Sequence, residues 1–129
     1  MVYLVRGLPG SGKSTYCRDF LGGMLHLEAD MYFSRGGEYK YNPDEIVNAH
    51  KWCFSAFCYA VQNDMDVAVA NTFVKKEQMR RYVSMCRKHG VPFKVIRCTG
   101  GFGSVHKVPQ GVLDFMRENF EDFKGEEIV

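Results

Sequence analysis

Short apolar segments recur along the chain and predict four β-strands. Residues 2–6 and 66–71 are almost wholly apolar, which is typical of strands buried inside a parallel sheet. Residues 24–30 alternate apolar and polar side chains, and residues 93–98 form another short apolar run. The pattern therefore predicts a sheet whose first strand lies at the start of the chain.

Apolar residues at helical spacing separate the later strands and predict helices. They recur through residues 44–63 and 75–89, and again from residue 109 to about residue 123. Glycines mark loops at residues 34–43 and 99–107, and the second of these loops is the candidate lid. The chain thus changes from strand to helix and back several times.

This alternation predicts an α/β fold: a short parallel sheet with helices on its faces, joined by right-handed crossovers. The length suits a single domain over residues 1–129. Ligands of such sheets bind beyond the carboxyl ends of the strands, which here are Gly7, Asp30, Asn71 and Cys98. We expect the chemistry to gather at these four positions.

Composition narrows the class of protein. The apolar fraction of 46% is enough for a core, and the net charge of +2 creates no general attraction for nucleic acid, although a local basic groove is compatible with it. No apolar run is long enough to cross a membrane, and the first residues lack the pattern of a signal peptide. We expect a cytoplasmic protein with no membrane contact and no obligate protein partner.

The cysteines favour a reducing compartment. Their number is odd and no C-x-x-C pair occurs, which argues against both a disulfide framework and a zinc site. We expect free thiols at Cys17, Cys53, Cys58, Cys86 and Cys98.

The segment GLPGSGKST satisfies G-x-x-x-x-G-K-[ST] between a predicted strand and a helix. Its glycines let backbone N–H groups line a cup that, with the helix N-terminus, holds phosphate oxygens. Lys13 would reach the β- and γ-phosphates, the Ser14 hydroxyl would bind Mg²⁺, and Thr15 would assist on the nucleotide side. ATP and Mg²⁺ are therefore the expected cofactors, and the expected nucleotide-binding residues are Gly7, Leu8, Pro9, Gly10, Ser11, Gly12, Lys13, Ser14 and Thr15.

Other classes of P-loop protein require motifs that this sequence lacks. A switch-type GTPase needs D-x-x-G after a strand and a base-reading N-K-x-D, and neither is found. A motor or AAA-type ATPase needs an apolar strand that ends in Asp-Glu, whereas the third predicted strand ends in VAVANTF. A small kinase, which needs a phosphate cup, an acceptor pocket and a lid, fits the length.

Five segments resemble, in order, small P-loop kinases of the AAA-33/zeta-toxin-like branch, which includes the kinase domain of phage polynucleotide kinase. The segments are GLPGSGKST, EADMYF, GEYKYNPDEIVNAHKW, VANTF and VHKVPQGVLDFMRENFE. The resemblance covers nearly the whole chain. It implies a P-loop NTPase fold of the kinase-like type and an enzyme that phosphorylates a 5′-hydroxyl end of DNA or RNA.

In that family an aspartate after the second strand takes the proton from the acceptor hydroxyl, and the matching position is Asp30. A carboxylate at a strand end that faces the γ-phosphate also suits this role on chemical grounds. Capping of a turn, or binding of Mg²⁺ through water, are the other interpretations of Asp30. Lys13 and Asp30 are the expected catalytic residues.

Candidate substrate and lid contacts are less closely defined. Arg35 suits an acceptor phosphate or an exposed loop, and Asn71 and Thr72 suit substrate contacts or the cap of the next helix. The resemblance implies an aspartate where Asn71 stands and a lid arginine where the loop carries His106 and Lys107. Lys107 is the candidate lid cation, but it lacks the hydrogen-bonding fork of an arginine.

Aromatic side chains follow the candidate base. Tyr39, Tyr41 and Trp52 suit either stacking on a nucleic-acid base or packing against the sheet.

Three functions remain open from the sequence. The first is the 5′-kinase, the second is a kinase of a nucleoside, a sugar nucleotide or another metabolite, and the third is a nucleotide-binding module without catalysis. The motifs do not distinguish DNA from RNA, or ATP from GTP.

Overall fold

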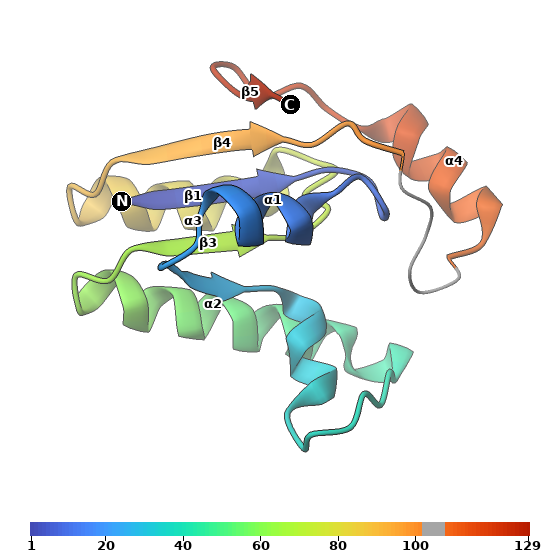
Figure 1. Cartoon of the computed structure of the whole chain (residues 1–129), viewed down its shortest axis with the longest axis horizontal. Helices are drawn as coiled ribbons and strands as arrows, with labels where there is room; N and C mark the ends of the chain where they lie inside the picture. Colours follow the sequence, from blue (N-terminus) through green and yellow to red (C-terminus); the bar gives the residue numbers. More distant parts are fainter. Residues whose placement is uncertain (102–107) are drawn as a thin grey trace.

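The computed structural model describes residues 1–101 and 108–129. Helices and strands alternate along the chain (Figure 1). In chain order they are β1 (Val2–Arg6), α1 (Lys13–Phe20), β2 (Leu25–Leu27), the 3₁₀ helices η1 (Ala29–Ser34) and η2 (Pro43–Glu45), α2 (Ile46–Gln62), β3 (Val67–Ala70), α3 (Glu77–Lys88), β4 (Phe93–Arg97), α4 (Gln110–Asn119) and β5 (Glu127–Ile128).

The strands form one parallel sheet in the order β2-β3-β1-β4-β5, which confirms the predicted fold class. β1 lies in the middle and pairs with β3 on one side and with β4 on the other. Because its neighbours cover both edges, the residues that follow β1 are held at the centre of the sheet.

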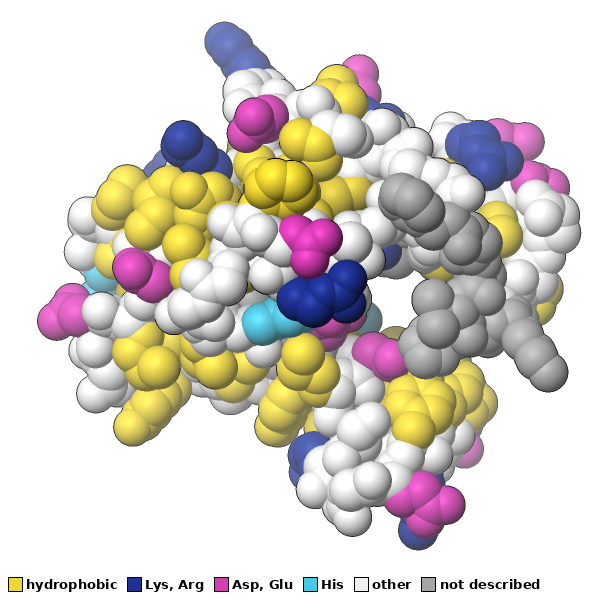
Figure 2. Space-filling model, in the orientation of Figure 1, with side chains coloured by type: hydrophobic (Ala, Val, Ile, Leu, Met, Phe, Trp, Pro, Cys, Tyr) yellow, Lys and Arg dark blue, Asp and Glu magenta, His cyan; other side chains and the backbone are white. Residues whose placement is uncertain are grey.

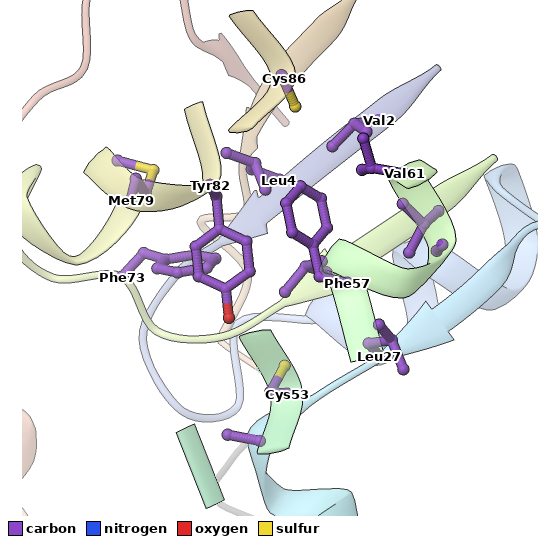
Figure 3. Close-up of a cluster of buried hydrophobic side chains, with 14 of the residues drawn as sticks. Val2, Leu4, Leu27, Cys53, Phe57, Val61, Phe73, Met79, Tyr82 and Cys86 are labelled. Atoms are coloured by element: carbon purple, nitrogen blue, oxygen red, sulfur yellow. The ribbon is translucent and has the colours of Figure 1, made fainter. Parts of the chain in front are cut away.

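The two faces of the sheet are covered unequally. On one face, Leu4 and Val69 pack with Phe57 of α2 and Met79 of α3 in the larger hydrophobic cluster (Figure 3). On the other face, α1 covers a smaller cluster that contains Val5, Cys17, Leu21, Ala68, Ala70, Ile96 and Cys98. Alternate residues of β1 therefore serve opposite cores, as the period of a strand requires.

Aromatic rings join the helices of the larger cluster. The ring of Tyr82 in α3 lies 4.8 Å from that of Phe57 and 5.1 Å from that of Phe54, both in α2. The fully buried ring of Phe57 contributes roughly 1.5–3 kcal/mol through the apolar surface that it removes from water. These contacts stabilise α2 and α3 as one layer.

The structure corrects three sequence-based expectations. The second strand ends at Leu27 rather than at residue 30, because residues 29–34 turn into a 3₁₀ helix. A fifth strand, β5, extends the sheet beside β4. The last helix is shorter than predicted, and none of its described residues is buried, so its apolar residues Val112 and Phe115 remain exposed.

Two arginines attach the C-terminal segment to the sheet. Arg6, fully buried at the end of β1, donates to Glu126 over 2.7 Å, and Arg97 of β4 donates to Asp122 over 2.6 Å and to Glu126 over 3.2 Å. Both guanidinium groups lie against the ring of Phe120, at 4.2 Å and 4.6 Å. We call these five residues the arginine clamp.

The cysteine expectation is confirmed, because all five cysteines have free thiols.

Across residues 1–101 and 108–129, no helix has the length and the apolar character that a membrane span needs.

Candidate nucleotide-binding site

The P-loop turns sharply between β1 and α1. A Cβ at Gly7 would collide with Oγ of Ser11 and would lie 2.6 Å from the carbonyl oxygen of Cys98, so only glycine fits there. Gly12 has a φ of 97°, a left-handed conformation that glycine adopts without strain, and α1 begins at the next residue. The loop therefore leads the chain directly into the N-terminus of a helix, as anion binding requires.

Lys13 lies across this loop. Its Nζ donates to the carbonyl oxygens of Gly7 over 3.0 Å and of Leu8 over 2.9 Å. Burial lowers the pKa of Lys13, and the negative charge of Glu28 opposes that shift. The ammonium group is thus held within the loop that sequence analysis assigned to phosphate.

Glu28, which sequence analysis missed, contacts the P-loop helix. Its Oε2 accepts the hydroxyl hydrogen of Ser14 over 2.9 Å and lies 2.8 Å from Nε2 of His26. The contacts of His26 with the thiol of Cys17 and with the carboxylate of Glu28 raise the pKa of His26 to about 10, which favours the protonated imidazole at neutral pH. Burial alone would raise the pKa of Glu28, but the contacts with His26 and Ser14 outweigh it and lower that pKa.

A sequence signal for Glu28 was present. It directly follows the alternating segment LHL, at the carboxyl end of a strand in an α/β sheet. Its pairing with Ser14 depends on how β2 and α1 meet in space, and the linear pattern does not contain that information.

Asp30 lies in η1 and is held by a tyrosine. The hydroxyl of Tyr39 donates to Oδ1 of Asp30 over 2.8 Å. Two causes raise the pKa of Tyr39 to about 12: loss of solvent around the phenol is the larger, and the hydrogen bond with the carboxylate is the second. The phenol therefore keeps its proton at neutral pH. The contact joins the loop after η1 back to the start of that helix.

Asn71, which directly follows β3, binds the backbone of the segment that carries Asp30. Its Oδ1 accepts the backbone N–H of Ala29 over 2.9 Å, and its Nδ2 lies 3.8 Å from the sulfur of Cys53. Ala29 stands between Glu28 and Asp30, so one amide side chain fixes the backbone that carries both carboxylates. The ends of β1, β2 and β3 are thus brought together as predicted.

The remaining candidates are more dispersed. The carbonyl of Thr72 accepts the N–H of Gly7 over 3.2 Å. α3 begins only at Glu77, so neither Asn71 nor Thr72 caps it, and that alternative is wrong. Arg35 lies 3.7 Å from the ring centre of Tyr32 and donates to its carbonyl over 2.9 Å. Lys107 and His106 lie outside the described residues.

Asp30 belongs to the segment 29–45, which lies below the sheet in Figure 1 and forms a protruding lobe at the lower right in Figure 2. Tyr39 and Tyr41 pack edge-on against Phe33, with ring centres 6.3 Å and 5.1 Å from its own. Trp52 packs against the core. A pocket of about 320 Å³ in this lobe is lined by Tyr32, Phe33, Arg35, Gly36, Glu38, Lys40, Asn42 and Glu45.

Comparison with known proteins identifies the family. Residues 2–100 match AAA_33, which is described as an AAA domain. The chain belongs to the AAA_33 family. It is also 32% identical to human NEDD4-binding protein 2 over 94 residues, which represent 69% of this chain and 5% of that protein. The AAA_33 chain therefore spans only a small part of this relative.

Solved structures share its fold. A gluconokinase from Sinorhizobium meliloti 1021 has a TM-score of 0.64 at 16% identity, covering 99% of this chain and 81% of its own. A chain of the Pnkp1/Rnl/Hen1 complex has a TM-score of 0.65 at 17% identity, covering 97% and 43%. Chaetomium thermophilum Kti12, in complex with ADP-AlF3, has a TM-score of 0.62 at 13% identity, covering 100% and 88%. The predicted P-loop kinase-like fold, and with it a nucleotide-binding fold, is confirmed.

Proposed function

We propose that this AAA_33 chain transfers the γ-phosphate of ATP to a hydroxyl group, and that its preferred acceptor is a 5′-hydroxyl end of DNA or RNA. The observation that carries the proposal is the pairing of a P-loop with a separate, positioned carboxylate, Asp30, at the same ends of the parallel strands. A cup alone would bind nucleotide, whereas a cup with an acid beside it can also activate an acceptor.

On the nucleotide side, the backbone N–H groups of residues 7–15 and the N-terminus of α1 bind the phosphate oxygens. Lys13 is already held inside the loop by the carbonyls of Gly7 and Leu8, and it exchanges these contacts for phosphate oxygens. Its charge offsets the negative charge that develops on the transferred group and on the leaving ADP.

The donor set fits Mg²⁺. Ser14 gives its hydroxyl hydrogen to Glu28, so its oxygen keeps lone pairs for a cation, and hydroxyl, carboxylate, phosphate and water oxygens are the ligands that Mg²⁺ prefers. Within residues 1–101 and 108–129 no cluster of three acidic, histidine or cysteine side chains forms a complete metal cage. This suits an ion that is bound mostly by phosphate and water. When bound, Mg²⁺ neutralises charge on the β- and γ-phosphates.

On the acceptor side, Asp30 accepts the proton of the attacking hydroxyl. The acceptor oxygen forms a bond to the γ-phosphorus while the bond from that phosphorus to the bridging oxygen of ADP breaks. Tyr39 occupies Oδ1 of Asp30 and orients the carboxylate. General-base assistance of this kind contributes about 10²- to 10⁴-fold to the rate.

Three features support a nucleic-acid end as the acceptor. Tyr39 and Tyr41, beside the proposed base, are 42% and 54% exposed, as stacking surfaces must be. Arg35 and Lys40 line the neighbouring pocket and supply positive charge for a phosphate of the strand. A chain of the Pnkp1/Rnl/Hen1 complex, described in one structure as an RNA repair complex, has the same fold.

The free thiols fit a reducing compartment, and we propose the cytoplasm.

A small-molecule acceptor is the second candidate, favoured by the acidic residues Glu38 and Glu45 in the same pocket, which suit sugar hydroxyls better than phosphates. The test is transfer of labelled γ-phosphate, with Mg²⁺, to a panel of acceptors: 5′-hydroxyl DNA, 5′-hydroxyl RNA, nucleosides and sugars. Label on the oligonucleotide ends supports the proposal. Label only on small acceptors favours the second candidate, and tight ATP binding without transfer indicates a non-catalytic module.

A further inference from the structure

The carboxylate that binds Ser14 of the P-loop follows β2. The family resemblance implies an acid at the end of β3 instead, where Asn71 stands. Glu28 follows β2, and its side chain, 21% exposed, is held between Ser14 of α1 and His26 of β2. Both contacts use Oε2, and in the described part of the chain no hydrogen-bond partner is found for Oε1. The carboxylate therefore has a fixed orientation and one oxygen that is open to a water molecule.

The end of β3 cannot provide this carboxylate. Asn71 stands there; its side chain is neutral, and its amide is already bonded to the N–H of Ala29. That bond fixes the residue next to Glu28. The side chain at the end of β3 thus holds the backbone, while the negative charge is placed one strand further along the sheet.

We propose that Glu28 is a positioning residue of the magnesium site and acts through Ser14. By accepting the hydroxyl hydrogen of Ser14, it leaves the serine oxygen turned outward as a ligand for the metal of a metal–nucleotide complex. His26 fixes the carboxylate from the other side. This inference rests on the metal–nucleotide binding in the proposed function, but it is independent of the acceptor and of catalysis.

The negative charge explains why a carboxylate is needed here rather than a neutral hydrogen-bond acceptor. A carboxylate that takes the hydrogen of a metal-binding group makes that group a stronger donor and fixes its direction, and loss of such an outer partner typically weakens metal binding about 10- to 100-fold. A neutral amide in the same place would keep a hydrogen bond to Ser14 but would lose the charge. Glu28→Gln therefore removes the negative charge while it keeps the size of the side chain.

The experiment measures metal binding without turnover. Mn²⁺ is titrated into the protein with ADP, and bound ion is followed by electron paramagnetic resonance; ADP binding without metal is measured by calorimetry. We expect Glu28→Gln to weaken Mn²⁺ binding about 10-fold or more, while metal-free ADP binding stays equal or becomes tighter. Asp19→Asn, an exposed acid on the same helix as Ser14, is the matched control and should leave both values unchanged.

A double-mutant cycle tests the route through Ser14. Ser14→Ala should weaken Mn²⁺ binding, and adding Glu28→Gln should cause little further loss if both residues act as one unit. Thermal melting checks that each variant folds; if Glu28→Gln does not fold, Glu28→Asp keeps the charge, shortens the reach and should give an intermediate loss. Unchanged Mn²⁺ affinity in Glu28→Gln, or fully additive losses, would overturn the inference. A wild type that binds Mn²⁺ and ADP but phosphorylates no acceptor overturns only the proposed kinase activity.

Discussion

The P-loop side of this AAA_33 chain and the lobe of residues 29–45, which we propose as its acceptor side, are built in different ways. The P-loop follows the central strand, and its backbone is fixed by neighbours: the N–H of Gly7 bonds to Thr72 and its Cα faces the carbonyl of Cys98. The acceptor side consists of two 3₁₀ helices joined by a loop, and residues 34–44 are exposed throughout. One region is tightly enclosed by the sheet, whereas the other projects from it.

This difference suits what we propose that each side recognises. A triphosphate is the same in every substrate complex, so a rigid cup of backbone donors serves it, and its residues form a motif. An acceptor can vary, and exposed loops on a rigid scaffold are where such variation is tolerated. Mutations on the two sides should therefore affect different steps.

The largest effect is expected for Lys13→Ala. Removing the ammonium group deletes the charge that stabilises the transferred phosphate, so transfer should fall about 10³-fold or more, and ATP binding should weaken as well. Calorimetry with ATP and a labelled-phosphate assay measure the two effects. Lys88→Ala, an exposed lysine at the end of α3, is the control. Transfer at the wild-type rate by Lys13→Ala would contradict the assignment.

Asp30→Asn should separate the two sides of the site. The amide cannot accept the hydroxyl proton, so transfer should fall about 10²- to 10³-fold, while the affinity for ATP changes little because Asp30 is not part of the cup. Initial rates and calorimetry on the same preparation provide the comparison, with Asp44→Asn in η2 as the control. Wild-type turnover would exclude Asp30 as the base, and lost ATP binding would show that the two sides are not separate.

The arginine clamp provides a stability test on the nucleotide side, because Arg6 directly precedes Gly7. Glu126→Gln leaves the buried guanidinium without its charged partner, and we expect a loss of about 3–5 kcal/mol in the free energy of unfolding, measured by urea denaturation. The exposed pair Arg80–Glu77 is the control, since Glu77→Gln should cost no more than about 1 kcal/mol. Equal effects of the two substitutions would contradict the role of the clamp.

The same ion pair predicts a pH dependence. Burial would raise the pKa of Glu126, but the hydrogen bond from Arg6, supported by the Phe123 N–H and Arg97, holds it below its usual value. The stabilisation is therefore present above the pKa of the unfolded carboxyl group and is lost as the pH falls through the lower folded value. Glu126→Gln should be less sensitive to acid over that range than the wild type.

The shape of the P-loop was easier to predict from the sequence than that of the lobe of residues 29–45, for physical reasons. The turn of the P-loop depends on single positions, such as the close approach of Ser11 to Gly7 and the left-handed φ at Gly12, so the motif was sufficient to predict the turn. Glu28 acts only through residues that folding brings near it. The second strand was predicted too long because Ala29 and Asp30 continue its alternating pattern, although they already belong to a 3₁₀ helix.

The C-terminal region was the least predictable part of the fold. β5 has two exposed residues, and it forms because the arginine clamp holds the segment beside β4 rather than because of its own pattern. α4 has the apolar spacing of a packed helix, but none of its residues is buried. The single-domain organisation and the lid role of Lys107 stay predictions.

The smallest effect, and the finest test of the comparison, is expected for Tyr39→Phe. The change removes the hydroxyl that donates to Asp30 but keeps the ring against Phe33. A hydrogen bond to a carboxylate of this exposure contributes about 1–2 kcal/mol, so turnover should fall about 5- to 30-fold with no change in the KM for ATP. Tyr41→Phe is the control, because Tyr41 packs on the same ring and should lose little. If both variants lose turnover equally, the aromatic surface rather than the position of Asp30 limits the acceptor side. If the KM for ATP rises in Tyr39→Phe, the acceptor lobe also acts on nucleotide binding, and the division between the two sides is wrong.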